Sequence, residues 1–271
     1  MKKELSILFS SYGEYQDLLP VTYHFFNKYW KECKYDVYWG SNGKKIDNFE
    51  SIAPKWKYIH TSNNDLGWSK NLKDYLENID TPYVLLLLDD FLILKKPKIE
   101  LIEDGFDLMK KNNAVYLRLN DKPKADKKIS NIFGTINYYS DYRSSLQPAI
   151  WKKDILLNLC DYNFNPWLFE WRAGIVQETI DDVFLGVFED IIFTQHCIEK
   201  GMWIENVLGI IEKEGIKVSN RKVWKLTNTK QETFLIKDKI ISLIPKQVLF
   251  HLRKIMKKGI FADDFQGYSH K

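Results

Sequence analysis

The stretch YVLLLLDDFLILKK, residues 83–96, places two adjacent carboxylates inside an apolar run. Residues 83–88 show no alternation with polar side chains, which is typical of a strand buried on both faces of a sheet. Ionised carboxylates are costly in such surroundings unless they are paired, hydrogen-bonded or bound to a cation. Asp89 and Asp90 therefore either cap the turn after the strand or hold a positively charged group.

Shorter strands and helices come before this run. Residues 5–9, 35–42 and 57–60 are predicted strands that end in turns, and the apolar spacing of 17–30 and 67–79 predicts helices between them. This alternation indicates a parallel, doubly wound α/β sheet, in which ligands bind at the carboxyl ends of the strands. The polar residues expected to meet at that edge are Ser10, Ser11, Tyr12, Gly40, Ser41, Asn42, Asp89 and Asp90.

Composition limits the compartment and the partners. The net charge of +4 comes from mixed signs, without the basic stripe of a nucleic-acid-binding protein. The three cysteines lie far apart and predict neither a disulfide framework nor a metal site. No apolar run is long enough for a signal peptide or a membrane span. We expect a cytoplasmic protein that does not bind nucleic acid.

Several enzyme classes do not fit the motifs of the chain. The five histidines are scattered without the spacing of zinc ligands. The chain contains no GxSxG, GxxxxGK[ST] or GxGxxG motif, which argues against a serine hydrolase, a P-loop kinase and a nicotinamide-dependent dehydrogenase.

The order of the remaining motifs resembles that of bacterial GT-A-type glycosyltransferases encoded in polysaccharide (capsule or O-antigen) biosynthesis clusters. The resemblance covers roughly residues 4–225. It implies a GT-A-like, Rossmann-type, mostly parallel sheet with helices on both faces, an acceptor-side hairpin and helical region, and a C-terminal helical segment. The motifs that carry it are SSYGEYQDLLP, YWKECKYDVYWGSN, GWSKNL, the apolar strand ending in DD, YLRLN, SLQPAIWKKDIL and NPWLFE.

The resemblance also divides the chain. Residues 1–225 are expected to form the GT-A-like domain, with a nucleotide-sugar half (1–120) and an acceptor half (121–225). Residues 226–271 are a basic C-terminal extension. Within it, 246–258 is a basic amphipathic segment that either lies on an anionic membrane surface or packs on the domain with a solvated basic face.

For the donor, the resemblance implies a nucleotide sugar together with Mn²⁺ or Mg²⁺, cations that prefer oxygen ligands. In the usual DxD motif the two aspartates face the same way on an extended backbone, whereas Asp89 and Asp90 are adjacent. We therefore assign Asp90 to the metal, and Asp89 either to the ribose or to a supporting position beside the metal.

Residues after the first strand are expected to hold the nucleotide. The resemblance places Ser10, Ser11 and Tyr12 at the base, with the Tyr12 ring stacking on it. Asp17 either accepts a hydrogen bond from the base or ribose, or caps the following helix.

Ser69 and Lys70 open a helix, and a helix N-terminus is a ready anion site. The resemblance places them at the donor diphosphate; the alternative is an ordinary helix start with a solvent-facing lysine. Arg118 lies in an apolar strand and needs a partner, either Asp89, the diphosphate or a structural salt bridge.

The acceptor side is implied by the motifs around residues 145–170. Gln147 and Trp167 are expected to line the sugar site, and Glu170 to be the base that deprotonates the acceptor hydroxyl in an inverting transfer. The rival base is the pair Glu189-Asp190.

The leading hypothesis is a glycosyltransferase that extends a surface polysaccharide, such as capsule or lipopolysaccharide, on a glycan or lipid-linked glycan acceptor. Two alternatives remain open. One is a nucleotidyltransferase of sugar-nucleotide metabolism, which usually has a glycine-rich phosphate loop after its first strand. The other is a carbohydrate-binding protein that kept the fold without the chemistry.

Overall fold

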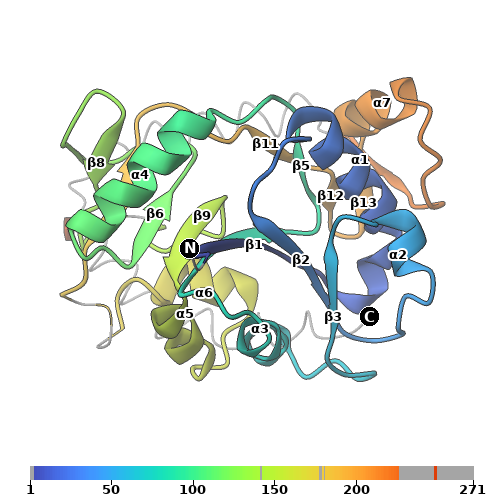
Figure 1. Cartoon of the computed structure of the whole chain (residues 1–271), viewed down its shortest axis with the longest axis horizontal. Coiled ribbons are helices and arrows are strands. Elements are labelled where there is room, and N and C mark those ends of the chain that lie inside the picture. The colour runs from blue at the N-terminus through green and yellow to red at the C-terminus, as the bar shows by residue number, and fades with distance from the viewer. Residues whose placement is uncertain (1–2, 141, 177–178, 180, 226–246, 249–271) are drawn as a thin grey trace.

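A computed structural model describes residues 3–140, 142–176, 179, 181–225 and 247–248. Its centre, within these residues, is a nine-stranded sheet (Figure 1). The strands are β1 (Leu5–Ser10), β2 (Asp36–Ser41), β3 (Lys57–His60), β4 (Tyr83–Leu88), β6 (Tyr116–Arg118), β7 (Lys127–Lys128), β8 (Phe133–Thr135), β9 (Ala149–Lys152) and β10 (Phe184–Val187).

The strand order is β3-β2-β1-β4-β9-β6-β10-β8-β7. β1 pairs in parallel with β2 and β4, and β2 pairs in parallel with β3. β9 is antiparallel to both β4 and β6, and β6 is parallel to β10. The predicted α/β fold with a mostly parallel sheet is therefore confirmed.

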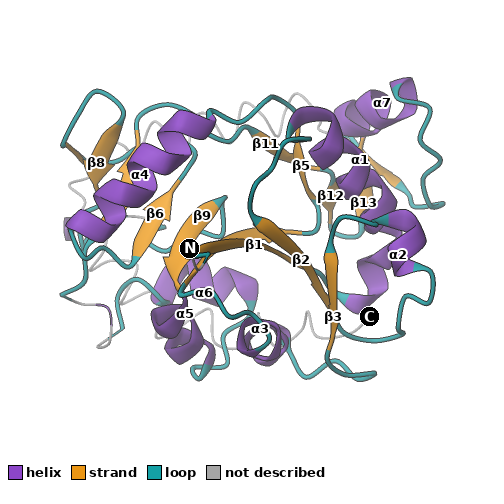
Figure 2. Ribbon diagram, viewed as in Figure 1, coloured by secondary structure: helices purple, strands orange, loops and turns teal. Residues whose placement is uncertain are grey.

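Helices cover both faces of this sheet, as predicted (Figure 2). α1, α2 and α4 pack on one face, and α3, α5 and α6 on the other. The helices are η1 (Gly13–Leu18, a 3-10 helix), α1 (Leu19–Tyr29), α2 (Phe49–Ile52), α3 (Trp68–Glu77), α4 (Ile99–Lys111), α5 (Lys153–Cys160), α6 (Pro166–Arg172) and α7 (Glu205–Lys213).

Burial on both faces explains why the central strands show no polar alternation. In β4, Leu85 and Leu87 join the core under α1 and α4, whereas Val84 and Leu86 join the core under α3 and α5. Because successive side chains point to opposite faces, a strand covered on both sides must be apolar throughout.

Smaller sheets flank the centre. β5 (Phe91–Ile93) pairs with β11 (Thr194–His196), and β12 (Ile198–Glu199), β13 (Met202–Ile204) and β14 (Val223–Trp224) form a three-stranded sheet. The apolar spacing of residues 190–204 is compatible with either a hairpin or a helix. This segment forms the short strands β11, β12 and β13, and β12 and β13 make a hairpin.

Two local expectations need correction. The sequence pattern of residues 135–151 is typical of a hairpin, which is the one expected on the acceptor side. This segment does not fold back on itself, since β8 pairs with β7 and β10 and β9 pairs with β4 and β6. The helix expected from residue 17 begins as η1 at Gly13, and α1 starts at Leu19 with Pro20 in its first turn. Proline fits there because the first turn needs no amide donor.

The predicted extension 226–271, including the segment 246–258, lies outside the described residues apart from 247–248. Among the residues that the structure describes, no helix is long and apolar enough to cross a membrane.

Candidate functional site

The carboxyl ends of β1 and β4 lie side by side and are tied together at Asp89. β4 ends at Leu88, and the chain turns at Asp89 and Asp90 before β5 begins. The amide of Asp89 donates to the Ser10 carbonyl at 3.3 Å, and the Thr22 hydroxyl donates to the Asp89 carbonyl at 2.8 Å. Asp89 and Asp90 therefore lie in a turn and not in a strand. Their side chains need not point to opposite faces of the sheet, as they would in an extended strand.

Asp89 is buried, with 6% of its surface exposed, but its side chain is not isolated. Its Oδ2 atom accepts hydrogen bonds from the Ser11 hydroxyl at 2.9 Å and from the Tyr12 amide at 3.1 Å. Asp89 therefore holds the loop after β1 in place and has little freedom to turn toward a ligand.

Asp90 follows in the same turn and is partly exposed. Its carbonyl accepts from the Cys197 amide at 2.9 Å. Burial raises the pKa of Asp89, with the Ser11 hydrogen bond opposing the shift, and burial together with the charge of Asp89 raises the pKa of Asp90. A pair in this condition favours either a proton or a bound cation.

The donor set suits a hard divalent cation, since both groups offer carboxylate oxygens. Within the described ranges, no group of three or more His, Cys, Asp and Glu side chains is arranged to hold a metal ion. Asp90 would hold Mn²⁺ or Mg²⁺ together with further oxygen ligands, such as those of a phosphate or of water.

The loop after β1 is also tied to the end of β2. The Gly13 amide donates to Oδ1 of Asn42 at 2.9 Å, and Nδ2 of Asn42 donates to Asp65 at 3.4 Å. Asp65 accepts a second hydrogen bond, from Asn71 of α3, at 2.7 Å. Asp65 and Asn71 carry no functional sequence signal beyond their places before and inside the helix of the GWSKNL motif.

Tyr12 sits above this network with 37% of its surface exposed. Its ring contacts the Tyr15 ring edge-on at 5.8 Å. Burial raises the pKa of the Tyr12 hydroxyl, and the charge of Asp65 adds to the shift. An exposed ring at this position has a face available to a planar ligand. Ser10, the last residue of β1, is buried, and its carbonyl accepts the hydrogen bond from the Asp89 amide.

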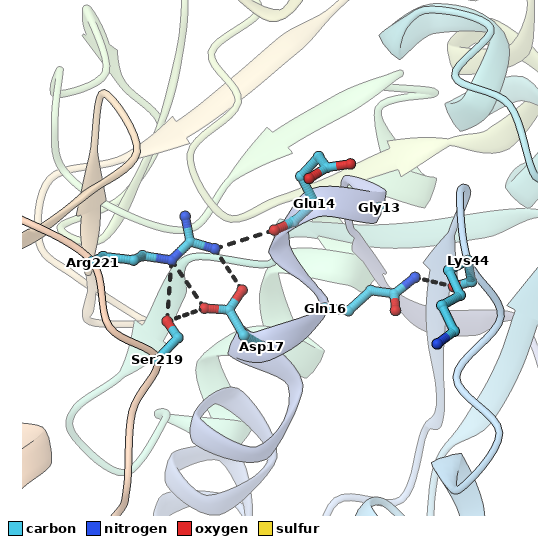
Figure 3. Close-up of a pocket in the computed structure, with 7 residues that line it drawn as sticks. All are labelled: Gly13, Glu14, Gln16, Asp17, Lys44, Ser219 and Arg221. Atoms are coloured by element: carbon cyan, nitrogen blue, oxygen red, sulfur yellow. Dashed lines mark hydrogen bonds and ion pairs between the residues drawn. The ribbon is translucent and has the colours of Figure 1, made fainter.

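Asp17 does not cap α1, whose first turn has no side-chain cap, and it forms an ion pair with Arg221. Its contact with a base or ribose stays a prediction. Arg221 Nε donates to Oδ2 of Asp17 at 2.9 Å and Nη2 donates to Oδ1 at 2.5 Å, while the Ser219 hydroxyl also donates to Oδ2 (Figure 3). These residues line an open pocket of about 470 Å³. No sequence signal pointed to Arg221.

Ser69 and Lys70 lie in the first turn of α3. Ser69 is buried and its hydroxyl donates to the Phe164 carbonyl at 2.7 Å, so it anchors α3 to the loop before α6. Lys70 is exposed. Their contact with a diphosphate stays a prediction.

The expectation that Arg118 pairs with Asp89 is wrong. Arg118 is fully buried and donates to the carbonyls of Tyr142 at 3.0 Å and Pro123 at 2.5 Å. β9 lies between β6, which carries Arg118, and β4, so the two side chains belong to separated strands. The positive charge of Arg118 acts on Glu170, whose pKa it lowers.

Glu170 lies on α6, which follows α5 in the chain. It accepts hydrogen bonds from the Leu146 amide at 2.8 Å and the Ser145 hydroxyl at 3.2 Å. Burial nevertheless raises the pKa of Glu170 overall. A carboxylate with a raised pKa is suited to accept a proton, while its hydrogen bonds also give it a structural role.

The other acceptor-side candidates come from separate parts of the chain. Gln147 accepts from Nδ2 of Asn120 at 2.6 Å, and Trp167 in α6 is 56% exposed. The rival base Asp190 follows β10 and accepts the Asp121 amide at 3.0 Å. Its neighbour Glu189 forms an ion pair of 2.9 Å with Lys98.

No protein-family model matches the chain, and no curated protein matches it by sequence. Among solved structures, S. aureus TarS is similar at 13% identity and a TM-score of 0.47, covering 81% of this chain and 41% of TarS. A UDP-glucose pyrophosphorylase complexed with UDP-glucose matches at 11% identity and a TM-score of 0.47, covering 79% of this chain and 98% of its own.

A CMP:2-keto-3-deoxy-manno-octonic acid synthetase complexed with CTP gives 11% identity and a TM-score of 0.44, covering 78% of this chain and 100% of its own. The alignment thus spans less than half of TarS but nearly all of the pyrophosphorylase and synthetase chains. At these identities the similarity concerns the fold alone.

Proposed function

We propose that this protein is a GT-A-like glycosyltransferase that moves a sugar from a nucleotide-sugar donor to a glycan acceptor of a surface polysaccharide, free or lipid-linked. The observation that carries the proposal is the turn after β4. There Asp89 holds the loop after β1 through Ser11 and Tyr12, and Asp90 stands beside it, partly exposed. Burial and the charge of Asp89 disfavour ionised Asp90, and a bound cation would offset this cost.

On the donor side, Asp90 would hold Mn²⁺ or Mg²⁺, and the metal would offset charge on the diphosphate leaving group. Asp89 acts by positioning, because its hydrogen bonds keep Tyr12 at the mouth of the site. The exposed Tyr12 ring is the surface on which the nucleobase stacks. Lys70, in the first turn of α3, adds positive charge on the diphosphate side.

On the acceptor side, Trp167 packs against the sugar and Glu170 accepts the proton of the attacking hydroxyl. The bond between the anomeric carbon and the phosphate oxygen breaks, and a new bond to the acceptor oxygen forms on the opposite face. This attack from the opposite face inverts the anomeric carbon. The nucleoside diphosphate leaves, and the proton of the acceptor hydroxyl stays on Glu170. The raised pKa of Glu170 supports this role, because proton transfer is most efficient when the base is poised near the working pH.

Product analysis tests the proposal against both rivals. UDP-, GDP-, CMP- and dTDP-sugars are incubated with the protein, Mn²⁺ and a glycan mixture, and released nucleotide is measured by chromatography. A glycosyltransferase releases the nucleoside diphosphate or monophosphate of one donor. Pyrophosphate release from a nucleoside triphosphate and a sugar 1-phosphate would instead show a nucleotidyltransferase. Glycan binding without either product would show a binding protein.

Asp90→Asn is the variant for this assay, and Asp107→Asn is its matched control. Asp107 is an exposed carboxylate on α4, away from the turn after β4. Release that stops in Asp90→Asn and continues in Asp107→Asn assigns the activity to the proposed site. Equal release by both variants contradicts the role of Asp90.

A further inference from the structure

The segment after α7 returns to the loop that follows β1. Within this return segment (residues 215–225), the Lys222 carbonyl accepts from the Trp203 amide at 2.8 Å and the Ser219 carbonyl accepts from Nε1 of Trp203 at 3.0 Å. β14 then pairs in parallel with β13. The segment is thus anchored to β13, and it presents Arg221 to η1.

Arg221 binds η1 through one edge of its guanidinium group. Nε and Nη2 donate to the two carboxylate oxygens of Asp17, and Nη2 also donates to the Glu14 carbonyl at 3.2 Å (Figure 3). The guanidinium carbon lies 4.6 Å from the centre of the Tyr15 ring. Carboxylate and ring together hold the group flat and fix its orientation.

The second edge of the guanidinium group keeps capacity to donate. Nη1 makes one long hydrogen bond, 3.5 Å to the Gly201 carbonyl, among the interactions of the described residues. Arg221 lines the open pocket together with Gly13 and Glu14, and 15% of its side chain is exposed. The ion pair with Asp17 uses Nε and Nη2, so Nη1 keeps the capacity to donate to a ligand.

Contacts connect Arg221 to the carboxylate pair. The Tyr15 ring under the guanidinium meets the Tyr12 ring, and the Tyr12 amide bonds to Asp89. The hydrogen bond that Arg221 donates to Asp17 raises the pKa of Arg221, and the charges of Asp17 and Asp89 add to the shift against the effect of burial. Arg221 is thus within electrostatic range of the proposed donor site.

We propose that Arg221 binds the donor diphosphate through Nη1, on the η1 side of the site, while Asp17 holds the guanidinium in place. This inference rests on the proposed function, since it assigns a phosphate-binding residue to the same site. Arginine suits the task because it is always charged and its planar donor array matches phosphate oxygens. The site then has a cation on both sides of the diphosphate, with the metal at Asp90 and the guanidinium at Arg221.

Nucleotide affinities separate this role from a structural one. The nucleoside diphosphate that binds best among UDP, GDP, CDP and dTDP is titrated with Mn²⁺ into the wild type, Arg221→Gln and Arg221→Lys, alongside its free nucleoside. Lys222→Gln is the matched control, since it removes the same charge from an exposed neighbour in the return segment. Thermal melting of each variant shows that it is folded.

Arg221→Gln is expected to lower the affinity for the nucleoside diphosphate at least about tenfold, which is the size of a lost charged hydrogen bond. The affinity for the free nucleoside should stay unchanged. Arg221→Lys should recover part of the loss, and Lys222→Gln should bind like the wild type. Equal weakening of diphosphate and nucleoside by Arg221→Gln, or no weakening, overturns the inference while the proposed function stands. Absence of nucleotide binding by the wild type overturns both.

Discussion

The Ser11 hydroxyl donates a 2.9 Å hydrogen bond to Oδ2 of Asp89, so the loop after β1 and the turn after β4 are joined through a buried carboxylate. The Tyr12 amide binds the same oxygen. The residue beside this joint, Asp90, is therefore held close to a second negative charge. Burial and the charge of Asp89 raise the pKa of its carboxyl group, although the backbone amide of Asp90 donates to it. Stability and ligand binding should oppose each other at this position.

Asp90→Asn is expected to stabilise the ligand-free protein while it removes cation-dependent binding. Burial and the charge of Asp89 disfavour ionised Asp90, and asparagine carries no charge. Melting at pH 8 should move upward by a few degrees, because about 1 kcal/mol corresponds to about 2–4 °C for a domain of this size. Asp107→Asn should leave the melting temperature unchanged. A lower melting temperature for Asp90→Asn would show that ionised Asp90 stabilises the fold.

The carboxylate pair also predicts how stability changes with pH. A carboxyl group whose pKa is higher in the folded state binds more protons there than when unfolded, so stability falls as pH rises. Burial raises the pKa of Asp89 from 3.8 to about 7. The loss of stability should therefore occur between these two pH values. Melting curves from pH 4 to pH 8 check this, and Mn²⁺ should reduce the loss at the upper end.

The double variant Asp89→Asn/Asp90→Asn separates the pair from other groups that titrate in the same window. The fall in melting temperature with pH should become shallower in this variant than in the wild type. An unchanged slope would assign the pH dependence to other carboxyl groups, such as Glu170, whose pKa is also raised by burial.

Gly40, near the end of β2, is expected to tolerate no side chain. A Cβ atom there would lie 2.5 Å from Cγ of Tyr75, whose hydroxyl donates to the Ser11 carbonyl at 3.2 Å. Gly40→Ala should therefore cost about 1–3 kcal/mol of unfolding free energy and weaken nucleotide binding by moving Ser11. Urea denaturation measures the loss.

Gly209 is the matched control for this substitution. It lies inside α7, and a Cβ atom there would meet nothing within 4 Å. Gly209→Ala should raise the unfolding free energy by about 0.5–1 kcal/mol, because alanine is the better helix former. If Gly40→Ala behaves like Gly209→Ala, the contact between β2 and Tyr75 does not constrain the loop after β1.

Glu170→Gln separates the chemical role of this residue from its structural one. Glutamine can still accept the Leu146 amide, so the fold and the affinity for nucleotide should be kept. Turnover should fall by about 10²–10⁴-fold, the usual contribution of a general base. Asp190→Asn in the same assay tests the rival, and a larger loss there than in Glu170→Gln would exchange their roles.

Glu170→Ala should behave differently from the glutamine variant. It leaves the Leu146 amide and the Ser145 hydroxyl without their acceptor, which costs about 1–3 kcal/mol when such groups are buried. Denaturation midpoints of the two variants make this comparison, and equal midpoints would show that the two hydrogen bonds add little stability.

Local sequence patterns predicted the parallel half of the fold well. The predicted bounds of β3 and β4 coincide with the observed strands, since each is a short run with turn residues on both sides. The meeting of residues 10–12 with Asp89 followed from the parallel topology alone. Local sequence patterns are sufficient to predict the fold where elements that follow one another in the chain are also neighbours in space.

Contacts between distant segments could not be predicted in this way. The partner of Arg118 depends on the insertion of β9 between β4 and β6, which no local pattern encodes. Arg221 and Asp17 are 204 residues apart in the chain, and their pairing follows from how the return segment docks on β13. A single arginine in an irregular segment carries no signal of that docking.

Whether a nucleotide and a metal bind at Asp89 and Asp90 is tested by a thermal-shift panel of UDP, GDP, CMP and dTDP, each with and without Mn²⁺, on the wild type and Asp90→Asn. A ligand that binds the folded state raises the melting temperature by mass action. The account predicts a shift with one nucleotide that Mn²⁺ enlarges in the wild type and does not enlarge in Asp90→Asn. No shift with any nucleotide, or an equal enlargement by Mn²⁺ in the variant, would contradict a nucleotide and metal site at Asp89 and Asp90.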